Sequence, residues 1–181
     1  TTLNMDPQWY SADPAAVGPL CVYPLIFTNN LTDVEDPRHR KNLQEYVKRG
    51  GFLLIDSCTN PSVTADPDRF LAQHTAIMSE LVPTAQVRAL PVTHAVYRQY
   101  FPMRETPPHS YMQQRFDAKW ARHGLYGVFD GERMFALISL SGLQCGWDNY
   151  GPPGHAEECM KMLVNIYVYA MTHGAETAPP R

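Results

Sequence analysis

The stretch GGFLLIDSCTN, residues 50–60, decides the fold. It contains a continuous apolar run, Phe52 to Ile55, that ends abruptly in Asp56. Unbroken apolar runs are typical of strands that are buried on both faces of a parallel sheet. The polar residues Ser57 and Cys58 follow at once. The stretch therefore predicts a central strand that ends in a patch of polar, chemically capable side chains.

The segment before this strand has the signals of a helix. In EDPRHRKNLQEYVKRGG, residues 35–51, Asp36 suits the N-cap, Pro37 the first helical position and Gly50 the C-terminal stop. A strand over residues 20–27 is predicted before it, and Pro24 places that strand at a sheet edge or a bulge. Strand, helix and strand in this order predict a right-handed parallel crossover.

The remaining elements complete an α/β pattern. A second helix is predicted to begin at Asp66 and Pro67, a short strand over residues 85–91, and a last helix over about 155–172. Residues 125–139 predict a hairpin that turns at Asp130 and Gly131. The predicted fold is α/β, with a parallel sheet core extended by an antiparallel hairpin. The expected organisation is an arm over residues 1–19, one domain over 20–174 and a disordered tail over 175–181.

Composition narrows the function classes. The chain of 181 residues has a formal charge of -3, so it lacks the basic footprint of a nucleic-acid-binding protein. No apolar run approaches the roughly 20 residues that span a bilayer. We expect no nucleic-acid partner, no membrane span and no cofactor. The compartment is left open, with an extracytoplasmic location favoured.

Ligands of open α/β sheets bind outside the carboxyl ends of the strands. Three predicted loops qualify, over residues 28–30, 56–60 and 91–94. A Gly- and Pro-rich loop around Trp147 is a candidate wall of the same crevice, because a Trp beside carboxylates and amides resembles a sugar-binding surface. The candidate ligand-binding residues are Asn30, Asp56, Ser57, Cys58, His94 and Trp147.

Four blocks of the sequence together resemble one protein family. LQEYVKRGGFLLIDSC, LPVTHAVY, LQCGW and LVNIYVYAMTH, spread over roughly residues 20–173, are similar in order and spacing to the bacterial domain-of-unknown-function family 4159. The resemblance implies a flavodoxin-like three-layer sandwich, akin to class I glutamine amidotransferases. Two departures stand out: Thr93 precedes His94 where the family has Asp, and the family's usual first strand and helix are not evident before Leu20.

The resemblance also implies one enzymatic alternative. Amidotransferases carry a nucleophilic cysteine after the strand that matches residues 52–56, and Cys58 falls near that position. His155 and Glu157 resemble the base and its orienting carboxylate. However, the tight nucleophile turn needs small residues at the positions of Asp56 and Asn60, and a carboxylate at Asp56 raises the pKa of a neighbouring thiol. A hydrolase or amidotransferase that uses Cys58 is therefore the second hypothesis.

Metal and disulfide chemistry are further alternatives. Asp56, Cys58, His94, Cys145 and His173 are all of ligand type, and zinc accepts such mixtures, but their spacing does not establish proximity. We therefore predict no metal site. Cys58 and Cys145 lie in two of the family blocks and form a candidate disulfide in an oxidising compartment. Cys21 and Cys159 are expected to be buried thiols.

The favoured function is a non-catalytic binding or assembly module. A small molecule or sugar is the expected ligand, and a protein partner or a second copy of the chain is the expected assembly partner. Trp9 and Tyr10 are the predicted anchors, because two adjacent large aromatic residues stand in an otherwise polar arm. Asp56 is expected to contribute more to folding or ligand contact than Cys58 contributes to chemistry.

Overall fold

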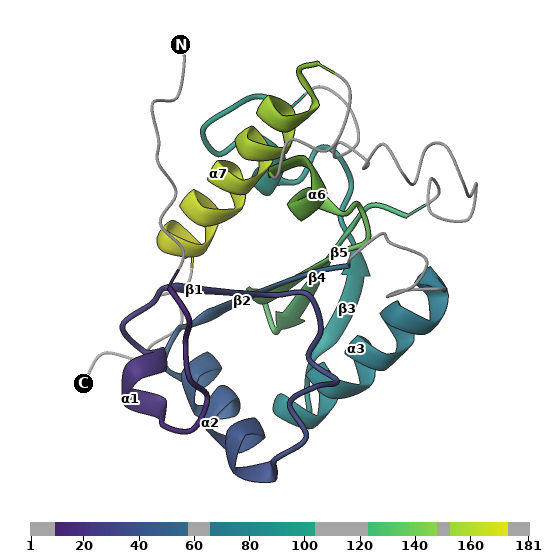
Figure 1. Ribbon diagram of the computed structural model, residues 1–181. Helices are drawn as coiled ribbons and strands as arrows, with labels where there is room; N and C mark the ends of the chain where they lie inside the picture. The colour runs from purple at the N-terminus through teal and green to yellow at the C-terminus, as the bar shows by residue number, and fades with distance from the viewer. Residues whose placement is uncertain (1–9, 58–65, 104–122, 148–152, 174–181) are drawn as a thin grey trace.

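A computed structural model describes residues 10–57, 66–103, 123–147 and 153–173. Helices and strands alternate along this part of the chain, and the strands form a single five-stranded sheet (Figure 1). In chain order the elements are α1 (Val17–Leu20), β1 (Leu25–Thr28), α2 (Pro37–Lys48), β2 (Phe52–Asp56), α3 (Pro67–Leu81), β3 (Gln86–Ala89), the 3-10 helix η1 (Ala95–Tyr97), β4 (Leu125–Asp130), β5 (Arg133–Ser139), α6 (Leu143–Trp147) and α7 (His155–His173).

The sheet has the order β1-β2-β5-β4-β3 and mixes parallel with antiparallel pairs. β1 and β5 both pair in parallel with β2, and β4 pairs antiparallel with both β5 and β3. Four of the five strands therefore run in one direction, with β4 alone reversed. The carboxyl ends of β1, β2, β3 and β5 and the beginning of β4 consequently lie at one edge of the sheet, which we call the carboxyl edge.

The predicted parallel core and antiparallel hairpin are both present, but they share a strand. β5 does not extend the sheet outward: it lies in the centre, with Leu53 opposite Ala136 and Asp56 opposite Ser139. The turn of the hairpin includes Gly131, whose φ of 60° favours glycine. The antiparallel extension consists of β4 and β3.

Helices pack on both faces of the sheet, and the side chains of β2 divide between two cores. Leu53 and Ile55 belong to the cluster beneath α2 and α3, whereas Phe52 and Leu54 belong to the cluster beneath α7. Every residue of β2 is buried, with Leu53, Leu54 and Ile55 at 0% exposure. The predicted central strand is confirmed. Because successive side chains alternate between faces, Asp56 points to the same face as Phe52 and Leu54.

The predicted helix signals are confirmed at two N-termini. The Asp36 side chain accepts a hydrogen bond from the Arg38 N–H at 2.8 Å, and Pro37 follows as the first helical residue. Asp66 accepts from the Arg69 N–H at 3.1 Å in the same manner, and Pro67 follows. Each cap satisfies a backbone donor that a helix start leaves without an intrahelical partner.

The predicted strand over residues 20–27 is wrong in its first half. Val17–Leu20 is the helix α1, and a turn closed by the Tyr23 N–H on the Leu20 carbonyl separates it from β1. The apolar run is split because Leu20 is buried as the end of a helix, while Pro24 stands immediately before the strand. Cys21 is exposed in this turn, so the expectation of a buried thiol there is also wrong. β1 is an edge strand of the sheet, as Pro24 indicated.

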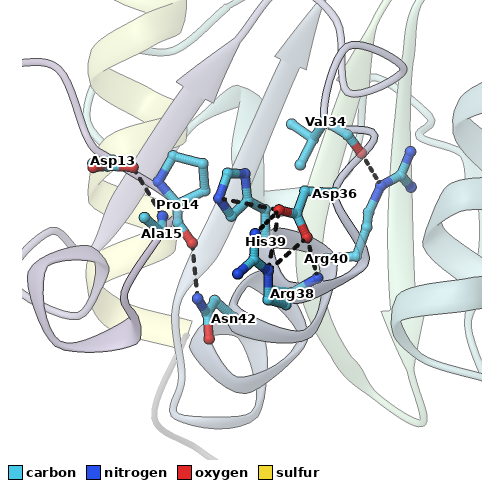
Figure 2. A network of polar contacts seen from close by, with 9 residues as sticks. All are labelled: Asp13, Pro14, Ala15, Val34, Asp36, Arg38, His39, Arg40 and Asn42. Atoms are coloured by element: carbon cyan, nitrogen blue, oxygen red, sulfur yellow. Dashed lines mark hydrogen bonds and ion pairs between the residues drawn. The ribbon is translucent and has the colours of Figure 1, made fainter.

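The described part of the N-terminal arm lies against α2. Figure 2 shows the Asn42 side chain donating to the Pro14 carbonyl, and the bond measures 2.9 Å. Ala12 packs against the core beneath α2 and α3. Tyr10 is 67% exposed, and Trp9 lies outside the described residues. The arm therefore contacts a helix of one face.

Candidate functional site

Asp56 lies at the carboxyl edge of the sheet, on the face covered by α6 and α7. It is the last residue of β2 and is fully buried at 0% exposure. Its carboxylate accepts two backbone hydrogen bonds from the start of α6, one from the Leu143 N–H at 3.1 Å and one from the Gln144 N–H at 2.9 Å. The side chain thus joins the central strand to a helix that begins 87 residues later in the sequence.

Burial and hydrogen bonding act on this carboxyl in opposite directions. Burial raises the pKa of Asp56 to about 6, although the N–H groups of Gln144, Leu143 and Gly142 and the Ser139 hydroxyl each lower it. Burial prevails because a carboxylate loses its hydration shell in the protein interior. The acceptor sites of the carboxylate face the backbone of residues 142–144 and the Ser139 hydroxyl. Asp56 is therefore a structural acceptor that fixes α6 on the sheet.

Three serines surround Asp56, and all three are fully buried. Ser139, its neighbour on β5, bonds the carboxylate and accepts the Ser141 N–H at 3.2 Å. The hydroxyls of Ser57 and Ser141 have no hydrogen-bond partner among the described residues. A buried hydroxyl without a partner costs free energy, so such groups call for an explanation, such as a bound molecule.

Two carboxamides lie beside the serines. The Asn29 amide donates to the Asp56 carbonyl at 3.4 Å and to the side-chain oxygen of Gln144. Asn30, a predicted ligand-binding residue, instead organises its own loop, because its side-chain oxygen accepts both the Thr32 N–H and the Thr32 hydroxyl. The structure thus places Asn29 beside the Asp56 cluster and Asn30 in an adjacent turn.

Trp147 lies at the carboxyl edge near Asp56, where its side chain is packed against neighbouring elements. Its indole N–H donates to the Cys159 carbonyl at 3.2 Å, and its ring lies 5.3 Å from that of Phe27 in an edge-to-face arrangement. Gly146 lies directly against Cys159, with no room for a Cβ. α6 and α7 therefore approach closely here, and the Trp147 ring bridges α7 and β1.

The residues of the enzymatic alternative have other partners. His155 Nε2 lies 3.5 Å from the Cys159 sulfur, one turn along α7, and burial lowers the pKa of His155. Glu157 pairs with Lys161 at 3.0 Å. Cys58 and the side chain of Cys145 lie outside the described part of the chain, as does the candidate disulfide. The prediction that Cys159 is a buried thiol is confirmed.

His94 is not brought together with Asp56. Its ring lies 5.6 Å from the ring of Tyr169, which in turn packs edge-to-face on Phe52, the first residue of β2. His94 therefore lies toward the opposite end of the strand from Asp56. Its Nδ1 caps η1 by accepting the Val96 N–H at 3.3 Å, which is the role of a loop histidine bonded to backbone.

The other polar features of this face do not form a metal centre. His173 stacks on Tyr169 with ring centroids 4.2 Å apart, and burial together with the nearby His173 lowers the pKa of His94. Within residues 10–57, 66–103, 123–147 and 153–173, no three side chains of His, Cys, Asp or Glu converge to hold a metal ion.

In the same ranges no helix combines the length and apolar character that a bilayer crossing needs.

A cavity of about 220 Å³ lies at the opposite edge of the sheet from Asp56. It is formed by the residues that lead into β1 and β2, among them Cys21, Tyr23, Tyr46, Arg49 and Gly51. Sequence reasoning did not predict it, because Cys21 was assigned to a strand.

A second polar group at the carboxyl edge was also missed. His123 precedes β4, and its Nε2 lies 3.2 Å from an oxygen of Asp68 in α3. Its Nδ1 lies 2.7 Å from the hydroxyl of Tyr126 on β4. The position of His123 beside the predicted hairpin was the available signal, because an antiparallel strand begins where its parallel neighbours end. The partner Asp68 lies 55 residues earlier and had no signal.

The fold and this edge define a mixed α/β domain whose polar side chains gather where the parallel strands end. The family model of Domain of unknown function (DUF4159) matches residues 1–171, so the chain belongs to this family. The match confirms the family resemblance and extends through the N-terminal arm. No curated protein matches the chain.

Proposed function

We propose that this domain is a binding module whose site at the carboxyl edge, around Asp56, is non-catalytic and takes a small neutral polar ligand, such as a sugar. The observation that carries the proposal is the pair of buried hydroxyls, Ser57 and Ser141, without partners among the described residues. A sugar hydroxyl both donates and accepts, which is the complement that two unpaired serine hydroxyls require. The neighbouring amides of Asn29 and Gln144 add further donors and acceptors.

The same cluster supports a binding role over a catalytic one. The Asp56 carboxylate accepts hydrogen bonds from backbone N–H groups at the start of α6. To act on a substrate it would have to break these bonds, which hold α6 on the sheet. His155 contacts the Cys159 sulfur, and Glu157 pairs with Lys161. In a catalytic triad the general base must lie within hydrogen-bond reach of the proton it takes, and the orienting carboxylate must contact that base. The contacts of His155 and Glu157 therefore favour the binding role. The neutral character of the ligand follows because the one carboxylate in the cluster is already bonded.

The test is a thermal melt in the presence of neutral saccharides. Glucose, galactose, N-acetylglucosamine and maltose, each at millimolar concentration, are added to the wild type and to the Ser57→Ala/Ser141→Ala double variant. A saccharide that binds only the folded state raises the melting temperature of the wild type. The double variant should lose that rise.

Ser79→Ala is the matched control, because the exposed Ser79 hydroxyl donates to the Thr75 carbonyl in its own helix. This variant should keep the full ligand response. An equal response in the double variant would place the ligand elsewhere, and no response of the wild type to any saccharide would reject a sugar ligand.

The cysteine-dependent hydrolase is the alternative proposal, together with kinship to the amidotransferase-like, flavodoxin-like superfamily. It requires Cys58 to be exposed and largely ionised near neutral pH. Labelling with a thiol-reactive probe from pH 5 to 9, with Cys58→Ala as the reference, separates the two functions. Rapid labelling of Cys58 at the acidic end of this range would favour the hydrolase.

Assembly through the N-terminal arm is the second part of the proposed function. The observation in its favour is the exposure of Tyr10, at 67%, on an arm whose following residues pack on α2. Light scattering on the wild type and on a Trp9→Ala/Tyr10→Ala variant is the test. Loss of a dimeric or larger mass in the variant would support assembly, and an unchanged mass would reject this role for the arm.

A further inference from the structure

Three side chains from separate parts of the sequence form a hydrogen-bonded chain on the α3 face of the sheet. Asp68 lies in the first turn of α3, His123 precedes β4, and Tyr126 lies on β4. His123 Nε2 is 3.2 Å from Asp68 Oδ1, and His123 Nδ1 is 2.7 Å from the Tyr126 hydroxyl. The imidazole is 7% exposed, whereas the Asp68 side chain is 57% exposed. The base is thus buried between a solvated carboxylate and a half-buried phenol.

The partners assign the proton positions. A carboxylate only accepts hydrogen bonds, so the neutral imidazole carries its hydrogen on Nε2, facing Asp68. The lone pair on Nδ1 then accepts the hydrogen of the Tyr126 hydroxyl. The phenolic proton is therefore aimed at the one imidazole nitrogen that is able to take it.

This arrangement differs from that of the other described histidines. His74 is held by the Phe70 carbonyl and the Leu31 N–H, both of the backbone. His94 caps η1, and His155 contacts a thiol. Among the histidines that the structure describes, His123 is the one with a carboxylate within 3.2 Å of one nitrogen and a hydroxyl within 2.7 Å of the other. A nucleophile within about 2.6–3.2 Å of a base that a third group orients is the signature of nucleophilic catalysis.

We propose that Tyr126 is a nucleophile activated by His123 and Asp68, and that it accepts an acyl group from a carboxylic ester at the carboxyl edge. The Tyr126 oxygen attacks the carbonyl carbon while His123 Nδ1 takes the phenolic proton. The ester C–O bond then breaks, and the departing alkoxide takes that proton from His123 and leaves as the alcohol. The products are an O-acyl-tyrosine and a neutral imidazole.

The same base completes a hydrolytic cycle. His123 Nδ1 takes a proton from a water molecule whose oxygen attacks the acyl carbon, and the phenolate of Tyr126 leaves and recovers the proton. No oxidant, reductant or metal enters either step. None of the three residues belongs to the Asp56 cluster, so this activity is independent of the proposed sugar site and extends beyond it.

If the hydrogen bonds among Asp68, His123 and Tyr126 were purely structural, the opposite reactivity would be expected. A tyrosine that is half-buried and hydrogen-bonded for stability reacts more slowly with electrophiles than an exposed tyrosine. Tyr100 and Tyr167 are 63% and 47% exposed and serve as references within the same molecule. The ratio of rates at Tyr126 and at these two residues therefore separates the two roles.

The experiment uses an aryl sulfonyl fluoride and p-nitrophenyl acetate, with the rate at each tyrosine measured by peptide mass spectrometry. In the first reaction the tyrosine O–S bond forms, the S–F bond breaks, fluoride leaves to water and the proton passes to His123. We expect Tyr126 to react at least about tenfold faster than Tyr100 and Tyr167, because general-base catalysis contributes about 10²–10⁴-fold. With p-nitrophenyl acetate we expect acetyl-Tyr126 and release of p-nitrophenol.

Variants identify the base. His123→Asn keeps a hydrogen-bonding group near Nδ1 but takes no proton, so it should lower the Tyr126 rate to that of Tyr100 or below. Asp68→Asn should lower it severalfold. Unchanged rates at Tyr100 and Tyr167, with an unchanged melting temperature, show that the variants are folded. For a variant that does not fold, the wild-type ratio alone decides: labelling of Tyr126 no faster than that of Tyr100 and Tyr167 overturns the proposal.

Discussion

Two aspartates lie near the same edge of the sheet, on opposite faces, and their partners differ in kind. Asp56 is buried beneath α6 and accepts from the backbone of Leu143 and Gln144. Asp68 is largely exposed on α3 and contacts a side chain, His123. A carboxylate that is bonded to backbone fixes the path of the chain. A carboxylate that is bonded to an imidazole sets the tautomer of a group that is itself able to exchange protons.

The difference also appears in what each carboxyl loses on folding. Asp56 gives up all contact with water, and burial raises its pKa to about 6. Asp68 keeps a side chain that is 57% exposed. Burial therefore makes Asp56 a determinant of stability. Asp68 keeps much of its contact with water and depends less on its protein partner. Substitutions at the two positions should separate stability from chemistry.

The largest effect is expected for Asp56→Ala. It removes the acceptor of two backbone N–H groups at the start of α6, at about 1–3 kcal/mol for each buried donor left without a partner. We expect the free energy of unfolding to fall by about 3 kcal/mol at about pH 4.5 in urea denaturation. The fall should be smaller near neutral pH, where the wild type already bears the cost of a buried ionised carboxylate.

Asp68→Ala is the matched substitution on the other face and should change stability by about 1 kcal/mol or less. Asp33→Ala, an exposed aspartate that accepts from the Asn30 amide, is a second control and should stay within about 0.5 kcal/mol. Equal losses at Asp56 and Asp68 would remove the distinction between the two aspartates.

The second effect is a pH dependence carried by Asp56. Its folded pKa of about 6 lies above the ordinary value of 3.8, so folding takes up a proton between these two values. Its contribution to stability is full below the ordinary pKa and is lost as the pH rises through the folded pKa. The wild type should therefore lose about 2 kcal/mol relative to Asp56→Asn between about pH 4.5 and pH 6.5.

The measurement is urea denaturation of both proteins across this range, because the carboxamide that replaces the Asp56 carboxyl does not titrate and all other groups are shared. A difference that does not change with pH would show that Asp56 keeps an ordinary pKa, and that its hydrogen bonds prevail over burial.

The third effect concerns Tyr126→Phe. This substitution removes the hydrogen-bond partner of His123 Nδ1, which lies on a side chain that is only 7% exposed. We expect a loss of about 1 kcal/mol in chemical denaturation. Asp68→Asn retains an acceptor oxygen for Nε2–H and should cost less than Tyr126→Phe. If Asp68→Asn were the more damaging of the two, the contact with Asp68 would stabilise His123 more than the Tyr126 hydroxyl does.

The sequence predicted the Asp56 region better than the His123 region, for a physical reason. The burial of β2, the end of that strand at Asp56 and its place in a parallel pair all follow from one local apolar run with caps and glycines around it. The N–H groups that donate to Asp56 lie 87 and 88 residues later, and no local pattern specifies such a contact. The expectation that Asp56 contributes to folding identified the residue but not its partner, which is the start of α6.

Other errors have the same origin. The apolar run over residues 20–27 reads equally well as one strand or as a helix end followed by a strand, because burial alone does not distinguish them. His94 follows β3 at the carboxyl edge, but its ring packs against Tyr169, whose ring contacts the first residue of β2. His123, Asp68 and Tyr126 are brought together only by the placement of α3 on the sheet.

The smallest expected effect has the opposite sign. Ser57 presents a fully buried hydroxyl without a described partner, beside a carboxylate whose acceptors face other donors. Replacing an unpaired buried hydroxyl with a methyl group removes a desolvation cost and leaves little space. Ser57→Ala should therefore raise the free energy of unfolding by about 0.5–1 kcal/mol in the absence of ligand.

Ser139→Ala is the control: because the Ser139 hydroxyl has partners, its removal should instead lower the free energy of unfolding. Thermal and urea denaturation of the two variants give the comparison directly. Destabilisation by Ser57→Ala would mean that its hydroxyl has a partner in the unliganded protein, and the argument for a ligand at this position would then rest on Ser141 alone.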